Sequence, residues 1–345
     1  MSEIPVIDFA SFLQGTPEQA QNTAKQVFEA FRDVGFAYLS NHGVPQSMVD
    51  KAFIWSKRFF SLPQSEKDKA PHPDEGANHR GYSRVGREKV SQMVFDQSSL
   101  DMLRKVPDEK ESFDIGYEDD DEGPANIWPP EESIPEFRKF FTTEFYPTCH
   151  MAGLDILRAL AAGMGLDERH FHLYHSKPAN QIRLLHYPAV EEAALRGGEK
   201  ERIGAHTDFG TLTLLFQDEV GGLEVERINQ DGKGEGGFVP APYVKGTMVV
   251  NIGDLLMRWS NDVLHSTTHR VRAPPASTAA ERDRSDEEGG RKKMVRERYS
   301  IPYFIAPVRD AVVDCLPGCC GPERPKKYEP IAAWEYLNMR MNASY

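Results

Sequence analysis

Apolar residues near the start of the chain recur at helical spacing in two segments. The first follows Thr16-Pro17-Glu18-Gln19, which has the form of a capping box with proline at the first helical position, and it runs to Gly35. The second covers residues 46–60, where valine, alanine and phenylalanine return every three or four positions. We therefore expect two helices here, with a short strand at Phe36–Leu39 between them.

The pattern changes twice further along the chain. Residues 61–130 are rich in loop-forming residues, and the acidic stretch 118–122 is typical of a solvated loop. Apolar positions from about Pro135 to Gly165 again have helical spacing and predict one long helix. After residue 179, short apolar runs separated by Gly, Pro and Asn predict strands. These runs are Ile182–Tyr187, Thr211–Phe216, Leu223–Glu226, Thr247–Ile252 and Tyr299–Ile305.

Helices followed by a series of short strands favour a mainly β fold, a barrel or sandwich that carries a helical layer. The chain has 345 residues, but single barrel domains reach about 250 residues, so we expect one elaborated compact unit. Its parts are an N-terminal helical and loop region at 1–130, and a long helix with the catalytic core at 131–345. Residues 273–297 are rich in charge, glycine and serine and are expected to form a flexible surface insertion.

Composition argues against several classes of protein. A formal net charge of −12 disfavours nucleic-acid and anionic-membrane partners, which select a basic surface. No apolar run reaches the roughly 18 residues of a membrane span, and the first residues have no secretory signal pattern. The adjacent Cys319 and Cys320 lack the Cys-x-x-Cys spacing of a zinc site, and the four cysteines are expected to be free thiols of a reducing compartment. We expect a soluble, cytoplasmic protein that binds a small molecule; its oligomeric state stays open.

A histidine and a carboxylate two positions apart are the first candidates for chemistry. On a strand, His206 and Asp208 would share one face, so both could bind the same atom. A distant histidine would complete a set of two imidazoles and one carboxylate, which suits Fe(II) and leaves coordination positions open for O₂. His269 and His265 both compete for that third place, whereas His42 lies in a turn without a nearby partner and is expected to be structural. The His-x-Asp spacing alone is weak evidence, because it also arises for structural reasons.

A candidate anion site lies downstream of these residues. Arg298 and Ser300 share one face of an expected strand, and a guanidinium beside a hydroxyl makes a charge-assisted seat for a carboxylate. The alternative for a lone arginine is a surface ion pair. Apolar neighbours on the same strand indicate burial instead, and a buried arginine needs an anion.

With these residues in view, the sequence resembles the 2-oxoglutarate/Fe(II) dioxygenases of the isopenicillin N synthase-like group. The resemblance covers nearly the whole chain, and its motifs are highly specific when taken together. It rests on Ile4–Phe9, Gly35–Tyr38, Asn41–Pro45, Phe59–Pro63, Arg183–Pro188, His206–Asp208, Asn251–Asp254, His269–Val271 and Arg298–Ser300. The family fold is a distorted double-stranded β-helix, a cupin-like jelly roll, with flanking helices, and this is the fold that the resemblance implies.

The resemblance also implies roles for the candidate residues. His206, Asp208 and His269 match the iron ligands, the last because the family ligand directly precedes Arg-Val. Arg298 and Ser300 match the pair that holds the far carboxylate of 2-oxoglutarate, and Tyr187 matches a tyrosine that helps to bind it. The implied cofactor is Fe(II), with 2-oxoglutarate and O₂ as co-substrates. The implied reaction releases succinate and CO₂ and oxidises the substrate through hydrogen abstraction by a ferryl species.

Within that family, the chain is most similar to fungal thymine 7-hydroxylase-like enzymes, in stretches such as Asn78–Ser83 and Arg258–Asp262. That likeness implies oxidation of a methyl group on a planar ring, with Phe304, Asn180 and Arg183 around it. Position 209 is Phe where the likeness leads us to expect Tyr, and the missing hydroxyl changes what the pocket can bind. Phe209 and Tyr82 complete the candidate substrate residues. Core packing for the phenylalanines, an ion pair for Arg183 and loop bracing for Tyr82 and Arg80 are the structural alternatives.

Several other functions agree with the same motifs. A fungal secondary-metabolite oxygenase that acts on ring methyl groups of polyketides is as compatible with the sequence as an enzyme that acts on a thymine-like pyrimidine. Desaturation, epoxidation and ring expansion are further outcomes of the same chemistry. An oxidase of the family that uses no 2-oxoglutarate also fits. A non-catalytic binder is disfavoured, because it would not need three metal ligands and an anion seat together.

Overall fold

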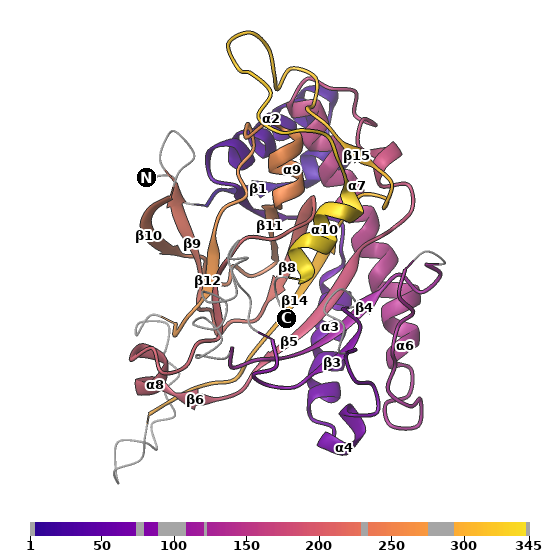
Figure 1. Ribbon diagram of the computed structural model, residues 1–345, viewed down its shortest axis with the longest axis vertical. Helices are drawn as coiled ribbons and strands as arrows, with labels where there is room; N and C mark the ends of the chain where they lie inside the picture. Colours follow the sequence, from indigo (N-terminus) through magenta and orange to yellow (C-terminus); the bar gives the residue numbers. More distant parts are fainter. Residues whose placement is uncertain are drawn as a thin grey trace.

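Two β-sheets face each other, and helices cover the outer face of the larger sheet (Figure 1). The computed structural model describes residues 4–73, 79–88, 108–120, 123–228, 234–274 and 293–342. The large sheet has the order β1 (Val6–Asp8), β2 (Phe36–Ser40), β11 (Thr247–Ile252), β8 (Leu212–Gln217), β14 (Arg298–Ile305), β5 (Gln181–Tyr187), β4 (Glu111–Gly116) and β3 (Gly81–Ser83). The small sheet has the order β10 (Gly234–Pro240), β9 (Leu223–Ile228), β12 (His269–Val271) and β7 (Ile203–His206). Two short pairs, β6 (Val190–Glu191) with β13 (Met294–Val295) and β15 (Val312–Val313) with β16 (Ile331–Ala332), complete the strands of the described residues.

All five strands expected from the apolar runs are present, within two residues of the expected bounds. Strands from residues 1–130 lie at both ends of the large sheet, and its centre comes from later residues. Of these outer strands, only β2 was expected from the sequence. The pattern of β4 gave no such signal, because Glu111–Gly116 mixes charged and apolar side chains and is nevertheless fully buried.

Successive side chains of the central strands belong alternately to two buried layers. On β5, Ile182 and Leu184 belong to the apolar cluster shared with the helices, whereas Leu185 and Tyr187 belong to a cluster shared with the small sheet. Successive side chains of a strand point to opposite faces, so one strand serves both layers. The space between the two sheets is therefore the inside of the jelly roll, and the polar residues of β5 and β14 that share this face point into it.

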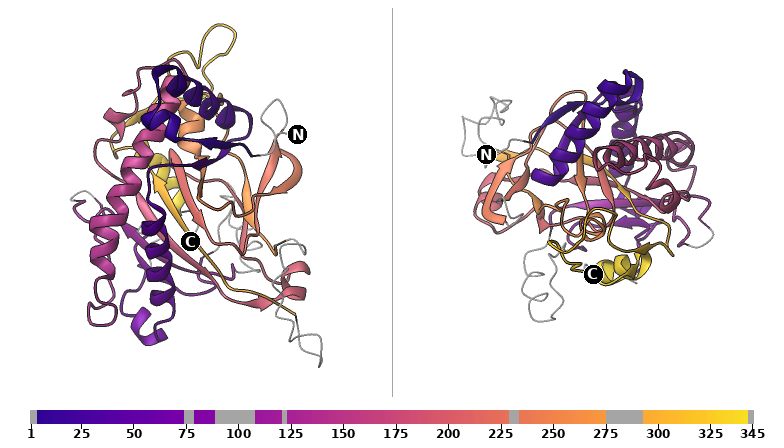
Figure 2. Two further views of the ribbon diagram at one scale, coloured as in Figure 1. Left: turned by 180° about the vertical axis from the view of Figure 1, so that it is seen from behind. Right: turned by 90° about the horizontal axis from the view of Figure 1, so that it is seen from above.

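The helices of the described residues are α1 (Ala10–Gln14), α2 (Pro17–Asp33), α3 (Gln46–Phe60), α4 (Gln64–Lys67), α6 (Phe137–Phe140), α7 (Tyr146–Gly163), α8 (Glu192–Arg196), α9 (Asp254–Trp259) and α10 (Ala333–Asn342), with a 3-10 turn at His172–Tyr174. Helices α2 and α3 begin and end much as the sequence predicts, whereas the short helices α1, α4, α8 and α9 were not expected from it. The capping box of α2 is confirmed: the Thr16 hydroxyl accepts from the Gln19 backbone N–H, and the Gln19 side chain accepts from the Thr16 N–H. Helices α2, α3 and α7 lie together on one side of the molecule (Figure 2).

The single long helix expected at 135–165 was wrong in one respect. A π-helical turn at Phe141–Phe145 separates α6 from α7. Pro147 lies in the first turn of α7, where it has no N–H to donate to the preceding turn. The chain accommodates this by a wider turn, in which the Tyr146 N–H bonds to the carbonyl of Phe141.

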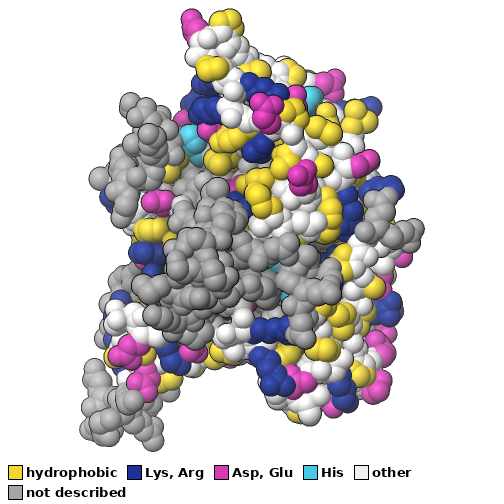
Figure 3. Space-filling view, in the orientation of Figure 1, with side chains coloured by type: hydrophobic (Ala, Val, Ile, Leu, Met, Phe, Trp, Pro, Cys, Tyr) yellow, Lys and Arg dark blue, Asp and Glu magenta, His cyan; other side chains and the backbone are white. Residues whose placement is uncertain are grey.

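Helix α10 was not expected from the sequence. It lies on the opposite side of the large sheet from α3 and α7, in yellow in Figures 1 and 2. Most of the insertion expected at 273–297 lies outside the described residues. None of the helices in the described ranges combines the length and apolar character needed to cross a bilayer. Basic and acidic side chains are intermixed over the described part of the face shown in Figure 3.

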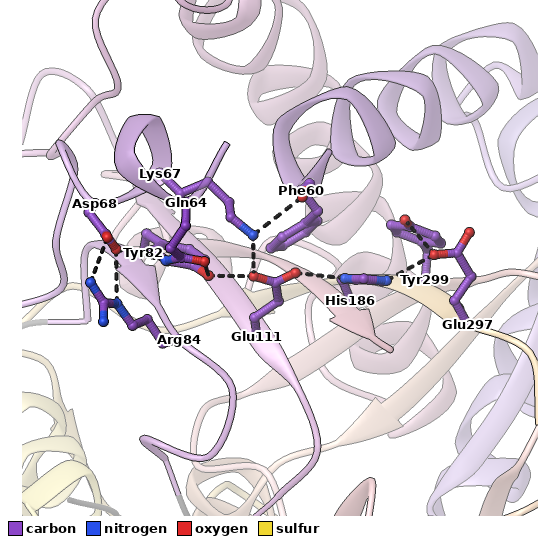
Figure 4. Close-up of polar contacts among 10 residues, drawn as sticks. All are labelled: Phe60, Gln64, Lys67, Asp68, Tyr82, Arg84, Glu111, His186, Glu297 and Tyr299. Atoms are coloured by element: carbon purple, nitrogen blue, oxygen red, sulfur yellow. Dashed lines mark hydrogen bonds and ion pairs between the residues drawn. The ribbon is translucent and has the colours of Figure 1, made fainter. Parts of the chain in front are cut away.

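A buried polar network joins α4, β3, β4 and β5 on the helical side of the sheet (Figure 4). The Glu111 carboxylate accepts hydrogen bonds from Lys67 at 2.8 Å and from the Tyr82 hydroxyl, and His186 Nδ1 lies 2.7 Å from its other oxygen. Burial alone would raise the pKa of Glu111, but these donors outweigh burial and lower it. Lys67 and Glu111 are each less than a tenth exposed, so either one left alone would be an uncompensated buried charge.

We expect Glu111→Gln to destabilise the fold by roughly 3–5 kcal/mol at pH 7, the cost of breaking a buried ion pair. A carboxylate with a lowered pKa adds stability above its ordinary pKa, and this contribution disappears as the pH falls through the folded value. The difference between the two proteins should therefore be full at pH 7 and shrink below about pH 4.5. Urea unfolding at several pH values measures it, with the surface variant Glu29→Gln as the control. A difference that does not depend on pH would contradict this account of Glu111.

Candidate metal and carboxylate site

Three potential metal ligands meet inside the jelly roll. Strands β7 and β12 pair antiparallel with His206 directly opposite His269, and their ring centres are 4.3 Å apart. Asp208 lies two residues beyond the end of β7, with its Oδ1 at 3.9 Å from His206 Nε2 and 3.7 Å from His269 Nε2. The three donor atoms lie within 4.8 Å of one another, which is close enough for one ion.

Hydrogen bonds orient each of these side chains. His206 Nδ1 lies 2.9 Å from the Gly204 carbonyl and His269 Nδ1 lies 3.2 Å from that of Thr267, so each ring donates from Nδ1 and turns the lone pair of Nε2 inward. This tautomer follows from the hydrogen bonds, because a carbonyl can only accept.

The carboxylate is held in a similar way. Asp208 Oδ2 accepts from the Thr213 hydroxyl at 2.6 Å and from the Asn251 amide at 2.7 Å. Its Oδ1 remains directed at the imidazoles. Two nitrogen donors and one oxygen donor on one side of an open space form a set that fits Fe(II).

Protonation at neutral pH also suits a metal. Burial, with a contribution from the neighbouring His269, lowers the pKa of His206 to about 4, so the imidazole is neutral. Burial works to raise the pKa of Asp208, but the two histidines and the hydrogen bonds from Asn251 and Thr213 outweigh it and lower that pKa. Neutral imidazoles and an ionised carboxylate are the forms that bind divalent metals.

The rival third ligand lies elsewhere. His265 is outside the cluster of donor atoms, and its backbone N–H bonds to the carbonyl of Phe31. A second cluster, His72 with His79 and Asp114, has ligand-like spacing. Arg183 fills it instead, donating to both oxygens of Asp114 and to His79 Nδ1, so a guanidinium already supplies the positive charge that a metal would bring.

A buried arginine lies further along the large sheet. Arg298 is 1% exposed and donates to the Ser300 hydroxyl at 3.0 Å and to Gln217 Oε1 at 3.3 Å, while its Nε has no hydrogen-bond partner in the described part of the chain. Its guanidinium carbon lies 4.9 Å from the ring centre of Tyr187, which pairs with it in the sheet. No carboxylate of the described residues forms an ion pair with Arg298, so the site has the character of an anion seat.

Sequence reasoning missed a second guanidinium close to this seat. Arg202 is fully buried, and its guanidinium carbon lies 5.8 Å from the ring centre of Tyr187. Burial first, and then the charge of Arg298, lower the pKa of Arg202 to about 10. The available signal was its position four residues before His206, which in an extended segment places both side chains on one face. Two guanidiniums around one tyrosine strengthen the positive potential at the seat.

The metal cluster and the anion seat open into one cavity of about 200 Å³. Its walls include the alternate residues of two paired strands, Gln181, Arg183, Leu185 and Tyr187 on β5 and Arg298, Ser300, Pro302 and Phe304 on β14. Phe209 and Asn180 also line it. Apart from the rival ligand His265, the structure therefore brings together every site residue proposed from the sequence except Tyr82, which lies outside the cavity walls in the network of Figure 4.

The polar groups expected to read the substrate already have protein partners. The Asn180 amide donates to His150 and to the Tyr303 hydroxyl, both at 3.0 Å, and its oxygen accepts from the Ala306 N–H. Arg183 donates to Asp114 at 2.7 Å and to Glu88 at 2.8 Å. The structural alternative for Arg183 is thus realised, and both side chains contribute mainly shape to this part of the wall.

Helix α10 closes one side of the cavity. Trp334, Leu337 and Met341 line it, and Arg340 stacks on Phe209 at 4.4 Å from the ring centre. Arg340 is 2% exposed and forms a buried ion pair with Asp254 on α9. The environment of the residue after Asp208 is therefore set by a helix more than a hundred positions away in sequence.

Comparison with known proteins places this geometry in context. A family model described as "non-haem dioxygenase in morphine synthesis N-terminal" matches residues 4–131, and one described as "2OG-Fe(II) oxygenase superfamily" matches 178–307. The chain is 39% identical to the proline hydroxylase buaE of Petromyces alliaceus, covering 99% of this chain and 100% of that protein. It is 38% identical to the 2-oxoglutarate-Fe(II) type oxidoreductase ppzD of Metarhizium rileyi, over 99% and 91%. The crystal structure of full-length Neurospora crassa thymine 7-hydroxylase with alpha-KG and thymine is 37% identical, with TM-score 0.84 and coverage of 99% and 96%.

We expect His206→Ala, Asp208→Ala and His269→Ala each to weaken Fe(II) binding by more than about 100-fold, beyond the effect of losing an outer hydrogen-bond partner of a ligand. His265→Ala should bind Fe(II) like the wild type. Anaerobic metal titration of the folded variants, checked by circular dichroism, measures this. Loss of binding in His265→Ala with retention in His269→Ala would reverse the assignment of the third ligand.

Proposed function

Because this chain belongs to the 2-oxoglutarate/Fe(II)-dependent oxygenases, we propose that its cavity holds Fe(II), 2-oxoglutarate and a small planar substrate whose methyl group it oxidises. The family identifies the enzyme as a 2-oxoglutarate-dependent Fe(II) oxygenase. When bound, Fe(II) together with 2-oxoglutarate and O₂ supplies the oxidising chemistry that removes a hydrogen from the substrate. The observation that carries our assignment is one cavity lined by a two-histidine, one-carboxylate cluster and a buried arginine without a carboxylate partner among the described residues.

We assign distinct tasks to the residues of the cavity. His206, Asp208 and His269 would hold the metal by their inward-facing Nε2 and Oδ1 atoms. Arg298 and Ser300 would bind the far carboxylate of 2-oxoglutarate by charge-assisted hydrogen bonds, with the Tyr187 ring packed beside them. The apolar walls exclude water from the reacting groups. None of these residues needs to act as a general acid or base.

The aromatic walls support a flat substrate. Phe209 and Phe304 both line the cavity, and Phe304 pairs across the sheet with Thr213, whose hydroxyl donates to Asp208. Phe304 therefore lies next to the position that holds the metal-binding carboxylate. Offset stacking on an aromatic face favours planar rings by about 0.5–1.5 kcal/mol beyond buried area. The likeness to the Neurospora crassa enzyme, crystallised with thymine, is in keeping with such a ring.

A saturated ring is the second candidate. The relative from Petromyces alliaceus, named a proline hydroxylase, covers the same length as this chain at 39% identity. A cyclic amino acid would fit a cavity of about 200 Å³ as readily as a pyrimidine. Desaturation, epoxidation or ring expansion would use the same site with a different substrate pose, and product mass separates these outcomes.

A screen of substrate-dependent succinate formation tests the proposal. It should contain thymine, uracil derivatives, methylated aromatic polyketides and cyclic amino acids, with product analysis for each active compound. Turnover confined to aliphatic amino acids or peptides would rule out the planar substrate and leave the reaction class intact. Turnover that needs no 2-oxoglutarate would rule out the proposed co-substrate.

Removing the positive charge of Arg298 should weaken the binding of 2-oxoglutarate far more than that of the oxidised substrate. We expect Arg298→Gln to raise the KM for 2-oxoglutarate about 10- to 150-fold, the equivalent of a charge-assisted hydrogen bond of roughly 1.5–3 kcal/mol, with a much smaller effect on the KM of the oxidised substrate. Steady-state kinetics with each compound varied in turn measures the two constants, and Arg32→Gln on the surface is the matched control. An unchanged KM for 2-oxoglutarate would show that the carboxylate binds elsewhere.

Position 209 should influence the choice of ring. We expect Phe209→Tyr to increase the preference for thymine by about 2- to 12-fold, since a neutral hydrogen bond contributes roughly 0.5–1.5 kcal/mol. Competition between thymine and a methylated aromatic compound, followed by product ratios, measures the change. A ratio equal to that of the wild type would mean that the ring edge does not reach position 209.

A further inference from the structure

A second buried arginine of the cavity wall has no carboxylate partner among the described residues. Arg80 is 7% exposed and lines the cavity, and within the described ranges its guanidinium hydrogen-bonds only to the carbonyl of the preceding residue, His79, at 2.7 Å. Its buried Nε has no hydrogen-bond partner there. Burial lowers the pKa of Arg80, but the group remains charged at neutral pH. A buried cation without an anion costs free energy, so its presence in a cavity needs an explanation.

The described carboxylates around Arg80 already have cationic partners. The pairs are Arg183 with Asp114 (2.7 Å) and with Glu88 (2.8 Å), Lys110 with Glu88, and Arg309 with Asp120 (2.9 Å). With Arg80 included, four cations face three carboxylates, so the described part of this wall has an excess of one positive charge. A ligand with one negative charge would neutralise it.

The chain makes room for this guanidinium. A Cβ atom at Gly116, the last residue of β4, would lie 2.0 Å from Arg80 Nη2 and 2.2 Å from its Cζ. Glycine at this position lets the flat group lie directly against the end of the strand. Arg80 is thereby held in place by backbone, which preserves its donors for a ligand.

The place of Arg80 in the sheet separates it from the 2-oxoglutarate seat. Gly116 pairs with Gln181, and Gln181 pairs with Phe304, so Arg80 lies at the Phe304 end of β14. Arg298 begins the same strand six residues earlier, which places the Cα atoms of Arg298 and Phe304 about 20 Å apart at roughly 3.3 Å per residue. Under the proposed function, the far carboxylate of 2-oxoglutarate is bound at Arg298 and its other end lies at the metal, so neither carboxylate is left for Arg80. The anion that Arg80 lacks therefore belongs to a different molecule.

We propose that Arg80 binds a carboxylate of the oxidised substrate, so that this enzyme acts on an organic acid. The inference rests on the proposed function and specifies its substrate class. A ring anchored by its carboxylate at Arg80 would lie along Phe304, beside the metal-binding residues, with the opposite edge of the ring toward them. A neutral pyrimidine such as thymine would leave the guanidinium without a counter-charge.

Matched acids and amides test this proposal, because a carboxamide keeps the shape of the acid and removes its charge. The probes are 3-methylbenzoate with 3-methylbenzamide, and L-proline with L-prolinamide. The readout is the probe concentration that gives half-maximal stimulation of succinate formation. With the wild type we expect at least one acid to act at an about 10- to 100-fold lower concentration than its amide. In Arg80→Gln the two should become nearly equal, and Arg80→Lys, which keeps the charge, should retain part of the preference.

Two controls separate this inference from the proposed function. Succinate formation without any probe reports on the iron and 2-oxoglutarate sites. If the wild type forms no succinate under these conditions, the result counts against the proposed function. Arg158→Gln, a change at a partly exposed arginine of α7 paired with Asp155, should keep the acid preference of the wild type. Circular dichroism and thermal unfolding show whether the Arg80 variants are folded. The proposal would be overturned if the wild type responded equally to acid and amide, or responded to neither. It would also be overturned if folded Arg80→Gln kept the acid preference of the wild type.

Discussion

The Asp208 carboxylate is the point on which the arrangement of the site depends. Its Oδ2 is bound by Thr213 on β8 and Asn251 on β11, which belong to the large sheet, whereas its Oδ1 faces two histidines of the small sheet. One side chain thus links the two halves of the jelly roll. With one oxygen held by hydrogen bonds, the other keeps its direction, and the donor atoms are oriented before a metal arrives. Removing either donor would free the carboxylate to rotate and would loosen the contact between the sheets at this point.

The alternation of side chains between the two faces of β5 and β14 forms the cavity around this carboxylate. One face of each strand packs against the helices with apolar side chains, and the other presents polar and aromatic groups to the space between the sheets. The two strands carry an arginine seat near one end and an aromatic wall near the other, with the Asp208 carboxylate beside the aromatic end. The order of reactants that we propose follows from this geometry. The co-substrate takes the Arg298 end, and the oxidised molecule takes the side of Phe304 and Arg80.

The buried arginines of the cavity wall near Phe304 differ in whether a carboxylate of the protein is paired with them. Arg183, a candidate reader of the substrate, is fully engaged with Asp114 and Glu88, and a charge that is paired inside the protein has little to offer a ligand. Arg80, which looked like a loop brace in the sequence, has a buried donor without a partner among the described residues. Specificity in such a cavity comes from the polar groups that the fold leaves without partners, because these are penalised unless the right ligand is present.

Reaction class, the main strands and the candidate residues of the metal cluster and the anion seat could all be read from the sequence alone. They were predictable because the alternation of side chains along a strand and the family motifs are both visible within a few consecutive residues. Only the folded chain shows that Tyr82 belongs to a separate network with Glu111, that Arg202 lies beside Tyr187, and that α10 covers Phe209. Each of these depends on contacts between residues far apart in sequence. Whether a buried charge is paired or available is a property of such contacts, and no local pattern of residues records it.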